Sequence, residues 1–204
     1  MKKLISLALS VVISVSMALT SMAATNLPNL KKEVMELEGE TVTFYYYEVG
    51  DVSYTEYDTF SGHNVVKCDN VTGIITLNDR YVGRKPTNSL PENYTISSPL
   101  TLKANQVWKL YNTGAGDLTS DIIDAASWVA VLGAFLGGSV AKTTIKTIAQ
   151  KAVAANLPTI YYKEEQYYLD PVTRSRPKTG NVYTFYKSPT LSGATLGKAD
   201  CRVK

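Results

Sequence analysis

Histidine, cysteine and paired acidic residues are the side chains of this chain that could carry acid–base, nucleophilic or metal chemistry. The single histidine, His63, lies five residues before Cys68, so the two could supply two ligands of a zinc ion. No Cys-x-x-Cys pair, second histidine or His-Glu-x-x-His sequence completes a set of four ligands. The pattern predicts no metal site, and we expect His63 to be a polar residue of a strand or loop.

Two further patterns contain the right residue types without the spacing that their chemistry needs. Glu164 and Glu165 are adjacent, and neighbouring residues of a strand point to opposite faces, so we expect solvated charges and not an acid–base pair. Gly114-Ala115-Gly116 is not followed by the Lys and Ser/Thr of a phosphate-binding loop, and we interpret it as a turn that leads into a helix. With no Gly-x-Ser-x-Gly motif either, the sequence predicts a protein that is not an enzyme, has no catalytic residues and needs no cofactor.

The first 23 residues have the organisation of a secretory signal peptide. Lys2 and Lys3 precede an apolar run over residues 4–19, and Ser21-Met22-Ala23 is a small-x-small cleavage site. We expect a mature chain that begins at Ala24, with residues 24–204 as a single domain, in a secreted, extracellular protein. An uncleaved membrane anchor is the alternative.

The charge and the cysteines restrict the possible partners and the compartment. Removing Lys2 and Lys3 from the 21 basic residues leaves 19 against 18 acidic ones, a net charge of +1, so the sequence predicts no nucleic-acid binding. Cys68 and Cys201 make an even count in a chain that is expected to leave the cytosol, which favours a disulfide between them. Two unpaired thiols are the alternative.

Residues 117–157 are the longest segment with a helical pattern. Ser127 is the only polar side chain between Asp124 and Gly137, so the first half is apolar on all sides and must be buried. The second half places apolar residues on one face and lysines on the other, and Gly137-Gly138 permits a reversal between the halves. We therefore predict a helical hairpin. Its start is expected at Asp117, Thr119 or Ser120, and its apolar stripe consists of Ala141, Ile145, Ile148, Ala149 and Ala152.

The same hairpin has three possible environments. It could be the core of the domain, a hairpin that is released into a target membrane, or a permanent membrane span. The uncharged run over residues 125–141, the small-xxx-small pair of glycines and the lysines of the second helix suit anionic lipid. The residues assigned to this membrane-active role are Trp128, Gly133, Phe135, Gly137, Lys142, Lys146 and Lys151.

The segments on both sides of the hairpin are rich in β-branched and aromatic residues. Residues 41–111 and 159–204 predict two β regions, with hairpins around Gly50-Asp51 and around a basic tip. Residues 30–37 could form a helix of one or two turns. The fourteen tyrosines either pack across strands or stack on sugars or lipid. The basic tip, a candidate surface contact, consists of Arg174, Arg176 and Lys178.

These elements predict an α+β fold, an antiparallel β-rich secreted domain with a central apolar and amphipathic helical hairpin. The first functional hypothesis is a bacteriocin-like antibacterial protein whose hairpin acts on an anionic bacterial membrane. The alternative is an extracellular module that binds a cell-envelope component or another partner, with the hairpin as its structural core. The sequence does not define an oligomeric state.

Overall fold

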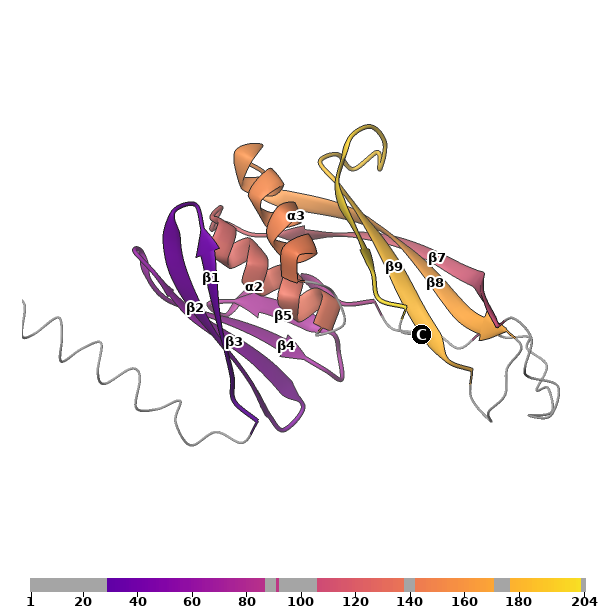
Figure 1. The fold of residues 1–204 in the computed structure, drawn as a ribbon, viewed down its shortest axis with the longest axis horizontal. Coiled ribbons are helices and arrows are strands. Elements are labelled where there is room, and N and C mark those ends of the chain that lie inside the picture. Colours follow the sequence, from indigo (N-terminus) through magenta and orange to yellow (C-terminus); the bar gives the residue numbers. More distant parts are fainter. Residues whose placement is uncertain (1–28, 87–90, 92–105, 138–141, 171–176, 203–204) are drawn as a thin grey trace, which may run out of the picture.

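The computed structural model describes residues 29–86, 91, 106–137, 142–170 and 177–202. The predicted signal peptide and the cleavage site before Ala24 lie outside these ranges. The described residues form one antiparallel sheet of ten strands, in which every strand pairs with the next one along the chain. Two helices are inserted between the seventh and eighth strands, and Figure 1 shows them between the two halves of the sheet. The predicted β-rich α+β fold is thus confirmed.

The bounds of the elements agree with most of the predicted strands. The strands are β1 (Lys31–Leu37), β2 (Glu40–Val49), β3 (Val52–Thr59), β4 (Gly62–Asp69), β5 (Ile74–Leu77), β6 (Arg80–Arg84), β7 (Val107–Thr119), β8 (Thr159–Asp170), β9 (Thr179–Tyr186) and β10 (Thr195–Asp200). The helices are α2 (Ala125–Leu136) and α3 (Lys142–Ala154).

The first strand replaces the short helix that residues 30–37 could have formed. Lys31–Leu37 pairs with β2 through the turn at Glu38 and Gly39, whose φ angles of 52° and 87° fit a tight two-residue hairpin turn. Met35 and Leu37 face the core, whereas Val34 lies on the outer face and is 56% exposed. A helix would have needed Val34 and Leu37 on one side, so the helical interpretation was wrong.

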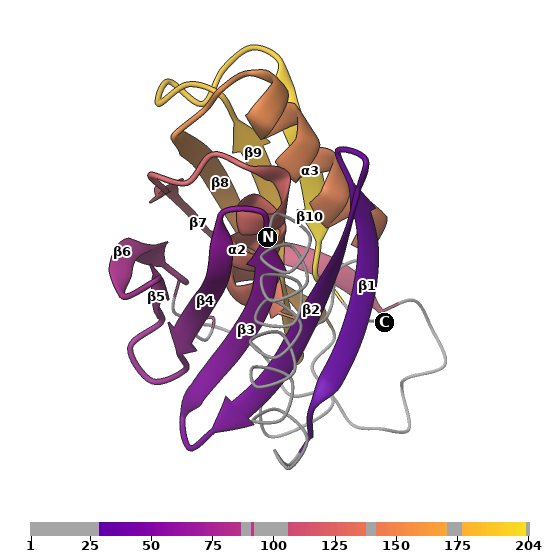
Figure 2. The ribbon, with the colours of Figure 1, turned by 90° about the vertical axis from the view of Figure 1, so that its left-hand side faces the viewer.

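The sheet divides into two halves that meet at a narrow seam. β6 and β7 share a single registered pair, Gly83 with Leu118. Gly83 permits this approach, because a Cβ atom there would lie 2.7 Å from the Leu118 side chain and 2.9 Å from the Asp117 carbonyl oxygen. The half formed by β1–β6 and the half formed by β7–β10 lie on either side of the helices (Figures 1 and 2).

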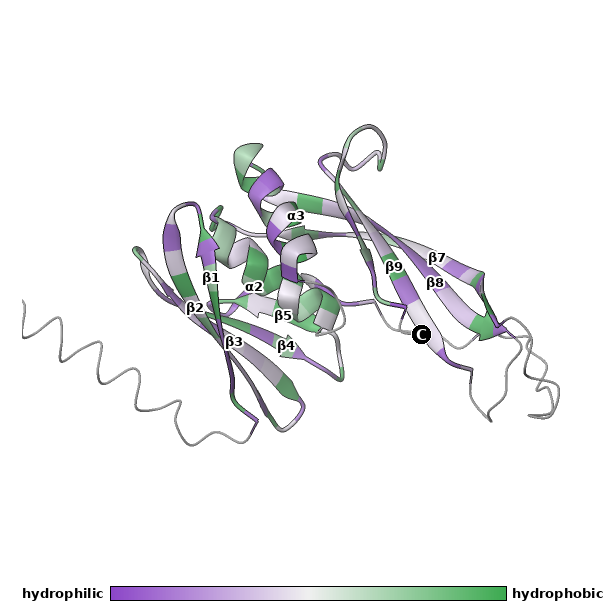
Figure 3. Ribbon diagram, in the orientation of Figure 1, coloured by the Kyte–Doolittle hydropathy of each residue, from purple (hydrophilic) through white to green (hydrophobic). Residues whose placement is uncertain are grey.

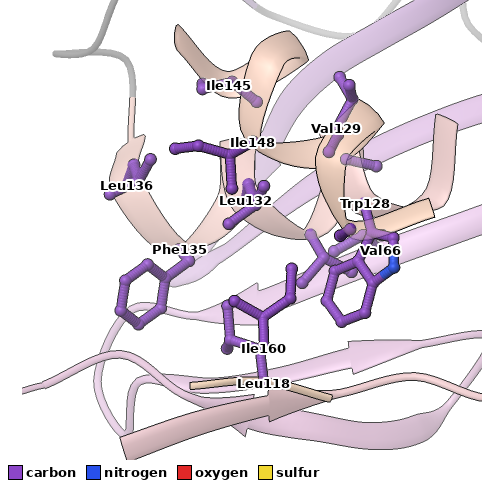
Figure 4. Packing of buried hydrophobic residues seen from close by; sticks show 14 of the residues in the cluster. Val66, Leu118, Trp128, Val129, Leu132, Phe135, Leu136, Ile145, Ile148 and Ile160 are labelled. Carbon is purple, nitrogen blue, oxygen red and sulfur yellow. The ribbon is translucent and has the colours of Figure 1, made fainter. Parts of the chain in front are cut away.

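The core is the space between the two halves, and α2 fills it. Ten of its twelve residues are buried, and the helix contacts β3, β4 and β5 as well as α3. Figure 4 shows Trp128, Leu132 and Phe135 of α2 beside Val66, Leu118 and Ile160 from the strands. The hydropathy colouring in Figure 3 shows the same contrast between an apolar α2 and a mixed α3. An all-apolar helix is therefore buried by strands from both halves of the sheet.

The second helix is amphipathic and covers the far edge of the sheet. Ile145, Ile148, Ala149 and Ala152 are buried, as the spacing predicts; Ala141 lies outside the described residues. α3 contacts β10, where a Cβ atom at Gly197 would lie 2.6 Å from the Ile148 side chain. Gly197 therefore lets α3 approach the sheet closely.

The start of the first helix differs from the prediction. β7 continues to Thr119, so residues 117–119 belong to the sheet, and Ser120, just beyond it, donates its N–H to the Pro158 carbonyl at 2.8 Å. Asp124 is the N-cap residue, and its carboxylate accepts a hydrogen bond from the Ser127 N–H at 2.6 Å. Gly137, with φ 67°, ends the helix. Pairing with β8 outweighs the local capping tendency of Asp117.

The glycines that were interpreted as a turn lie in the middle of β7. Gly114 pairs with Glu164 and Gly116 pairs with Tyr162 on β8. A Cβ atom at Gly116 would lie 2.5 Å from the Tyr162 hydroxyl oxygen and 2.7 Å from its ring. The two glycines leave space for the side chains of Tyr162 and Glu164 to lie across β7, so their role is close packing and not chain reversal.

Replacing these glycines tests the packing. We expect Gly116→Ala to lower the free energy of unfolding by about 1 to 3 kcal/mol, because Tyr162 must move out of its position in the core. Gly133→Ala is the matched control: no atom lies within 4 Å of a Cβ atom at Gly133. This helical substitution should be neutral or stabilise by up to about 1 kcal/mol. Chemical denaturation measures both, and equal effects would contradict the packing role of Gly116.

Candidate functional site

The residues assigned to membrane activity are divided between the core and the surface. Trp128 and Phe135 are fully buried in α2. Gly133 brings no second helix close, and Gly137 serves as the helix cap. Neither helix in the described part of the chain is long and apolar enough to span a bilayer. In this structure protein buries ten of the twelve residues of α2, and only Gly133 and Ala134 are partly exposed.

The lysines of α3 form the exposed side of that helix. Lys142 and Lys151 are exposed and Lys146 is half-buried. The ammonium group of Lys142 lies 2.7 Å from a carboxylate oxygen of Glu33 on β1, and the Glu33 side chain is only 14% exposed. This ion pair connects α3 to the first strand.

The structure separates the residues that could have bound zinc. His63 is on the outer face of β4, with Nδ1 3.0 Å from an Asp58 carboxylate oxygen and Nε2 3.8 Å from Glu56. Cys68 points to the opposite, inner face and is buried. His63 and Cys68 therefore cannot bind one ion.

The predicted disulfide is not formed in the structure, because the two cysteines are on strands that are far apart in the sheet. Cys68 is on β4 and Cys201 follows β10, so five strands lie between them. The Cys201 N–H donates to the Asn181 carbonyl at 2.8 Å. Burial raises the pKa of the Cys68 thiol, which keeps it protonated at neutral pH.

Tyrosines gather on the outer face of the first half of the sheet. We call the patch formed by Tyr45, Tyr47 and Tyr54 the tyrosine face. The Tyr47 and Tyr54 rings, a cross-strand pair of β2 and β3, are stacked with centroids 4.9 Å apart and planes at 4°. The ammonium group of Lys32 lies 5.9 Å from the Tyr45 ring centroid. All three tyrosines are half-buried, and Tyr45 lies two residues before Tyr47 on the same face of β2.

Charged groups of both signs surround the tyrosine face. The Tyr47 hydroxyl donates to Glu56, and burial and this hydrogen bond both raise the pKa of Tyr47. The ammonium group of Lys67, whose residue is the registered partner of Tyr54 on β4, lies 2.6 Å from an Asp79 carboxylate oxygen. The face therefore combines flat apolar rings with hydrogen-bond donors and acceptors.

Other tyrosines are part of the core, as the packing interpretation predicts. The buried Tyr57 hydroxyl donates to the Ser127 hydroxyl of α2 at 2.7 Å. Tyr162 and Tyr183 contact the Phe135 ring, with centroids 4.8 and 5.0 Å away. Strand alternation thus divides the tyrosines into an inner group that packs and an outer group that faces solvent.

A buried polar network lies on the inner face of the second half. Glu164 is 2% exposed. Its carboxylate accepts hydrogen bonds from the Tyr183 hydroxyl at 2.9 Å, the Asn181 amide at 2.9 Å and the Gln166 amide at 3.0 Å. The Asn112 amide in turn donates to Gln166 at 3.1 Å. Several donors therefore hold one carboxylate in place.

The description of Glu164 as a solvated charge was wrong, although the two glutamates do point to opposite faces. Glu165 lies on the outer face, 3.4 Å from the ammonium group of Lys163. Burial raises the pKa of Glu164, and the hydrogen bonds from Tyr183 and Gln166 oppose this rise. The sequence does contain an indication that Glu164 is buried. Every second residue of β8 lies on the same face, and that face carries Ile160, Tyr162, Glu164 and Gln166, of which the first two are core residues.

Two recesses lie at the end of the first half where α2 begins. The larger recess, of about 390 Å³, is lined by apolar residues that include Leu37, Val42 and the fully exposed Phe60, and by acidic residues that include Glu38 and Asp124. The smaller, of about 260 Å³, includes Arg80 and Asp121, which form an ion pair.

The predicted basic contact is described only in part. Arg174 and Arg176 lie outside the described residues, and Lys178 is exposed immediately before β9.

Comparison of the chain with protein-family models, with curated proteins and with solved structures finds no match.

The raised pKa of Glu164 predicts how stability depends on pH. The folded protein binds the Glu164 proton more tightly than the unfolded chain does. The stabilising contribution of the protonated form is therefore complete below the unfolded pKa, about 4.3, and is lost as pH rises through the folded pKa.

We expect the free energy of unfolding of Glu164→Gln, relative to that of the wild type, to increase as pH rises from about 4 to 7. Chemical denaturation across this range measures the difference. Glu165→Gln, on the outer face, is the control and should not reproduce the trend. A constant difference between wild type and Glu164→Gln would contradict the assignment.

Proposed function

We propose that this protein is an exported, non-catalytic binding protein that holds a cell-envelope glycan on its tyrosine face. The observation that carries the proposal is the stacked Tyr47–Tyr54 pair, which adjoins Tyr45 and lies outside the core cluster. Aromatic side chains with an apolar body and a polar tip are enriched at binding surfaces.

The chemistry of the face suits a polymer of sugar rings. The tyrosine rings offer apolar surface to the C–H groups of a sugar, and the Glu56 carboxylate, on the same face, can accept a hydrogen bond from one of its hydroxyls. The rings follow two adjacent strands, so the binding surface is an extended strip and not a closed pocket. An extended strip matches a chain molecule better than a small ligand.

The burial of α2 ranks this proposal ahead of the membrane-active hypothesis. Moving the helix into lipid would first expose Trp128, Leu132, Phe135 and the other buried residues of α2, at a cost on the order of 10 kcal/mol. That cost is comparable to the whole stability of a domain. The exposed Lys142 and Lys151 are the feature that supports membrane action as a second candidate.

The tyrosine face can be tested by binding to insoluble peptidoglycan. We expect wild-type protein to co-sediment with it, and the double variant Tyr47→Ala/Tyr54→Ala to bind at least about tenfold more weakly, since two stacking contacts are lost. Tyr47→Phe/Tyr54→Phe keeps the rings and should retain most of the affinity.

Two controls make this result specific. Tyr81, on β6 and 65% exposed, is more accessible than the stacked pair, yet Tyr81→Ala should leave binding unchanged. Dye release from anionic vesicles tests the second candidate. Binding that is insensitive to the Tyr47 and Tyr54 substitutions would refute the glycan site, and dye release that requires Lys142 and Lys151 would favour membrane action.

A further inference from the structure

The first strand is an open edge of the sheet. β1 pairs with β2 on one side, and no described residue pairs with its other side. Figure 2 shows it at the border of the sheet, next to β2. An open edge presents backbone N–H and C=O groups that can pair with another strand.

The tight turn determines which residues present these groups. The turn joins Leu37 and Glu40, which are paired, so this closing pair exchanges backbone hydrogen bonds. Hydrogen-bonded and non-hydrogen-bonded pairs alternate along an antiparallel ladder, and Met35, Glu33 and Lys31 follow Leu37 as bonded partners of β2. The backbone groups of Lys32, Val34 and Glu36 therefore point to the open edge.

The same three residues have their side chains on the outer face. Lys32 and Glu36 are exposed, and Val34, between them, is the apolar residue of the strand that solvent reaches most. The charge pattern reverses about Val34, with a cation two residues before it and an anion two residues after it. A strand with this pattern is complementary to itself when it is turned through a two-fold axis.

We propose that β1 pairs with β1 of a second copy of this chain, antiparallel and centred on Val34. In this register Lys32 lies opposite Glu36 of the second copy, Val34 lies opposite its counterpart, and Glu36 lies opposite Lys32. All three are hydrogen-bonded pairs, so backbone bonding and side-chain attraction coincide.

Other arrangements of the two strands are less favourable. A parallel, in-register pair places Lys32 against Lys32 and Glu36 against Glu36. An antiparallel pair centred on Lys32 or on Glu36 places like charges opposite each other. Charges on an edge strand commonly prevent pairing, but charges that are antisymmetric about the centre select one pairing.

This proposal does not depend on the glycan proposal, although it has a consequence for it. The two-fold axis is perpendicular to the sheet, so the outer faces of both copies lie on the same side. Lys32, at the interface, is the residue that lies over Tyr45. The two tyrosine faces would therefore form one longer surface.

A proline substitution tests the edge without weakening the strand's pairing with β2. We expect purified wild-type protein to dimerise with increasing concentration in sedimentation equilibrium. Val34→Pro should remain monomeric yet folded, because the N–H that it removes points to the open edge. Met35→Pro is the matched control: it removes an N–H that bonds to β2, so it should lower the melting temperature.

Charge reversal tests the register independently of any folding defect. Lys32→Glu and Glu36→Lys should each weaken dimerisation at least about tenfold, since two attractive pairs become repulsive. The double variant Lys32→Glu/Glu36→Lys should regain it, and a mixture of the two single variants should form a heterodimer.

Three results of these experiments would overturn the proposal. A wild-type protein that is monomeric up to about 1 mM overturns the proposal. A dimer that persists in Val34→Pro, or a double variant that stays monomeric while folded, also overturns it.

Discussion

The fold depends on the burial of one helix that has no polar face. α2 carries apolar residues around its whole circumference, so it is stable only where protein covers most of its surface, and ten of its twelve residues are buried. The two halves of the sheet and α3 supply this cover, and the strands direct Val66, Ile75, Leu118 and Ile160 toward it. The bent form of the sheet follows from this requirement, since a flat sheet would cover one side only.

The strands could largely be predicted from the sequence because their alternation is local. Val42 and Phe44 face inward and Thr43 and Tyr45 outward, as a period of two requires. The buried stripe of α3 could also be predicted, from the spacing of the apolar residues in that helix. These patterns indicate which side of a strand or helix is buried, and this can be predicted from the sequence of that element alone.

The errors concern features that depend on residues far away along the chain. Gly114 and Gly116 resemble a turn until β8 is placed beside them, where they give space to Glu164 and Tyr162. Asp117 resembles a helix cap until its pairing with Tyr161 is known. Cys68 and Cys201 resemble a disulfide until the sheet order separates them. In each case a tertiary contact overrides a sound local tendency.

Only part of the candidate site could be predicted from the sequence. The tyrosines of β2 and β3 were evident, but the choice between packing and binding depends on which face of the sheet is filled. Tyr57 enters the core and bonds to Ser127, whereas Tyr54, three residues earlier, stacks on Tyr47 outside. The two residues have the same chemistry and differ only in the parity of their positions on one strand.

The narrow seam between β6 and β7 has a consequence for the order in which the chain folds. Pairing within β1–β6 joins neighbouring strands and closes short loops, so it requires little loop entropy. In the other half, β7 and β8 are separated in the chain by both helices, so their pairing closes a long loop. The contacts of α2 with β3–β5 span long stretches of chain, 70 residues for the bond from Tyr57 to Ser127. Because one registered pair at Gly83 is too little to align the halves, their alignment must come from α2. The β1–β6 meander is therefore a local structure, whereas β7–β8 pairing and the docking of α2 are long-range events, and we expect these to limit the folding rate.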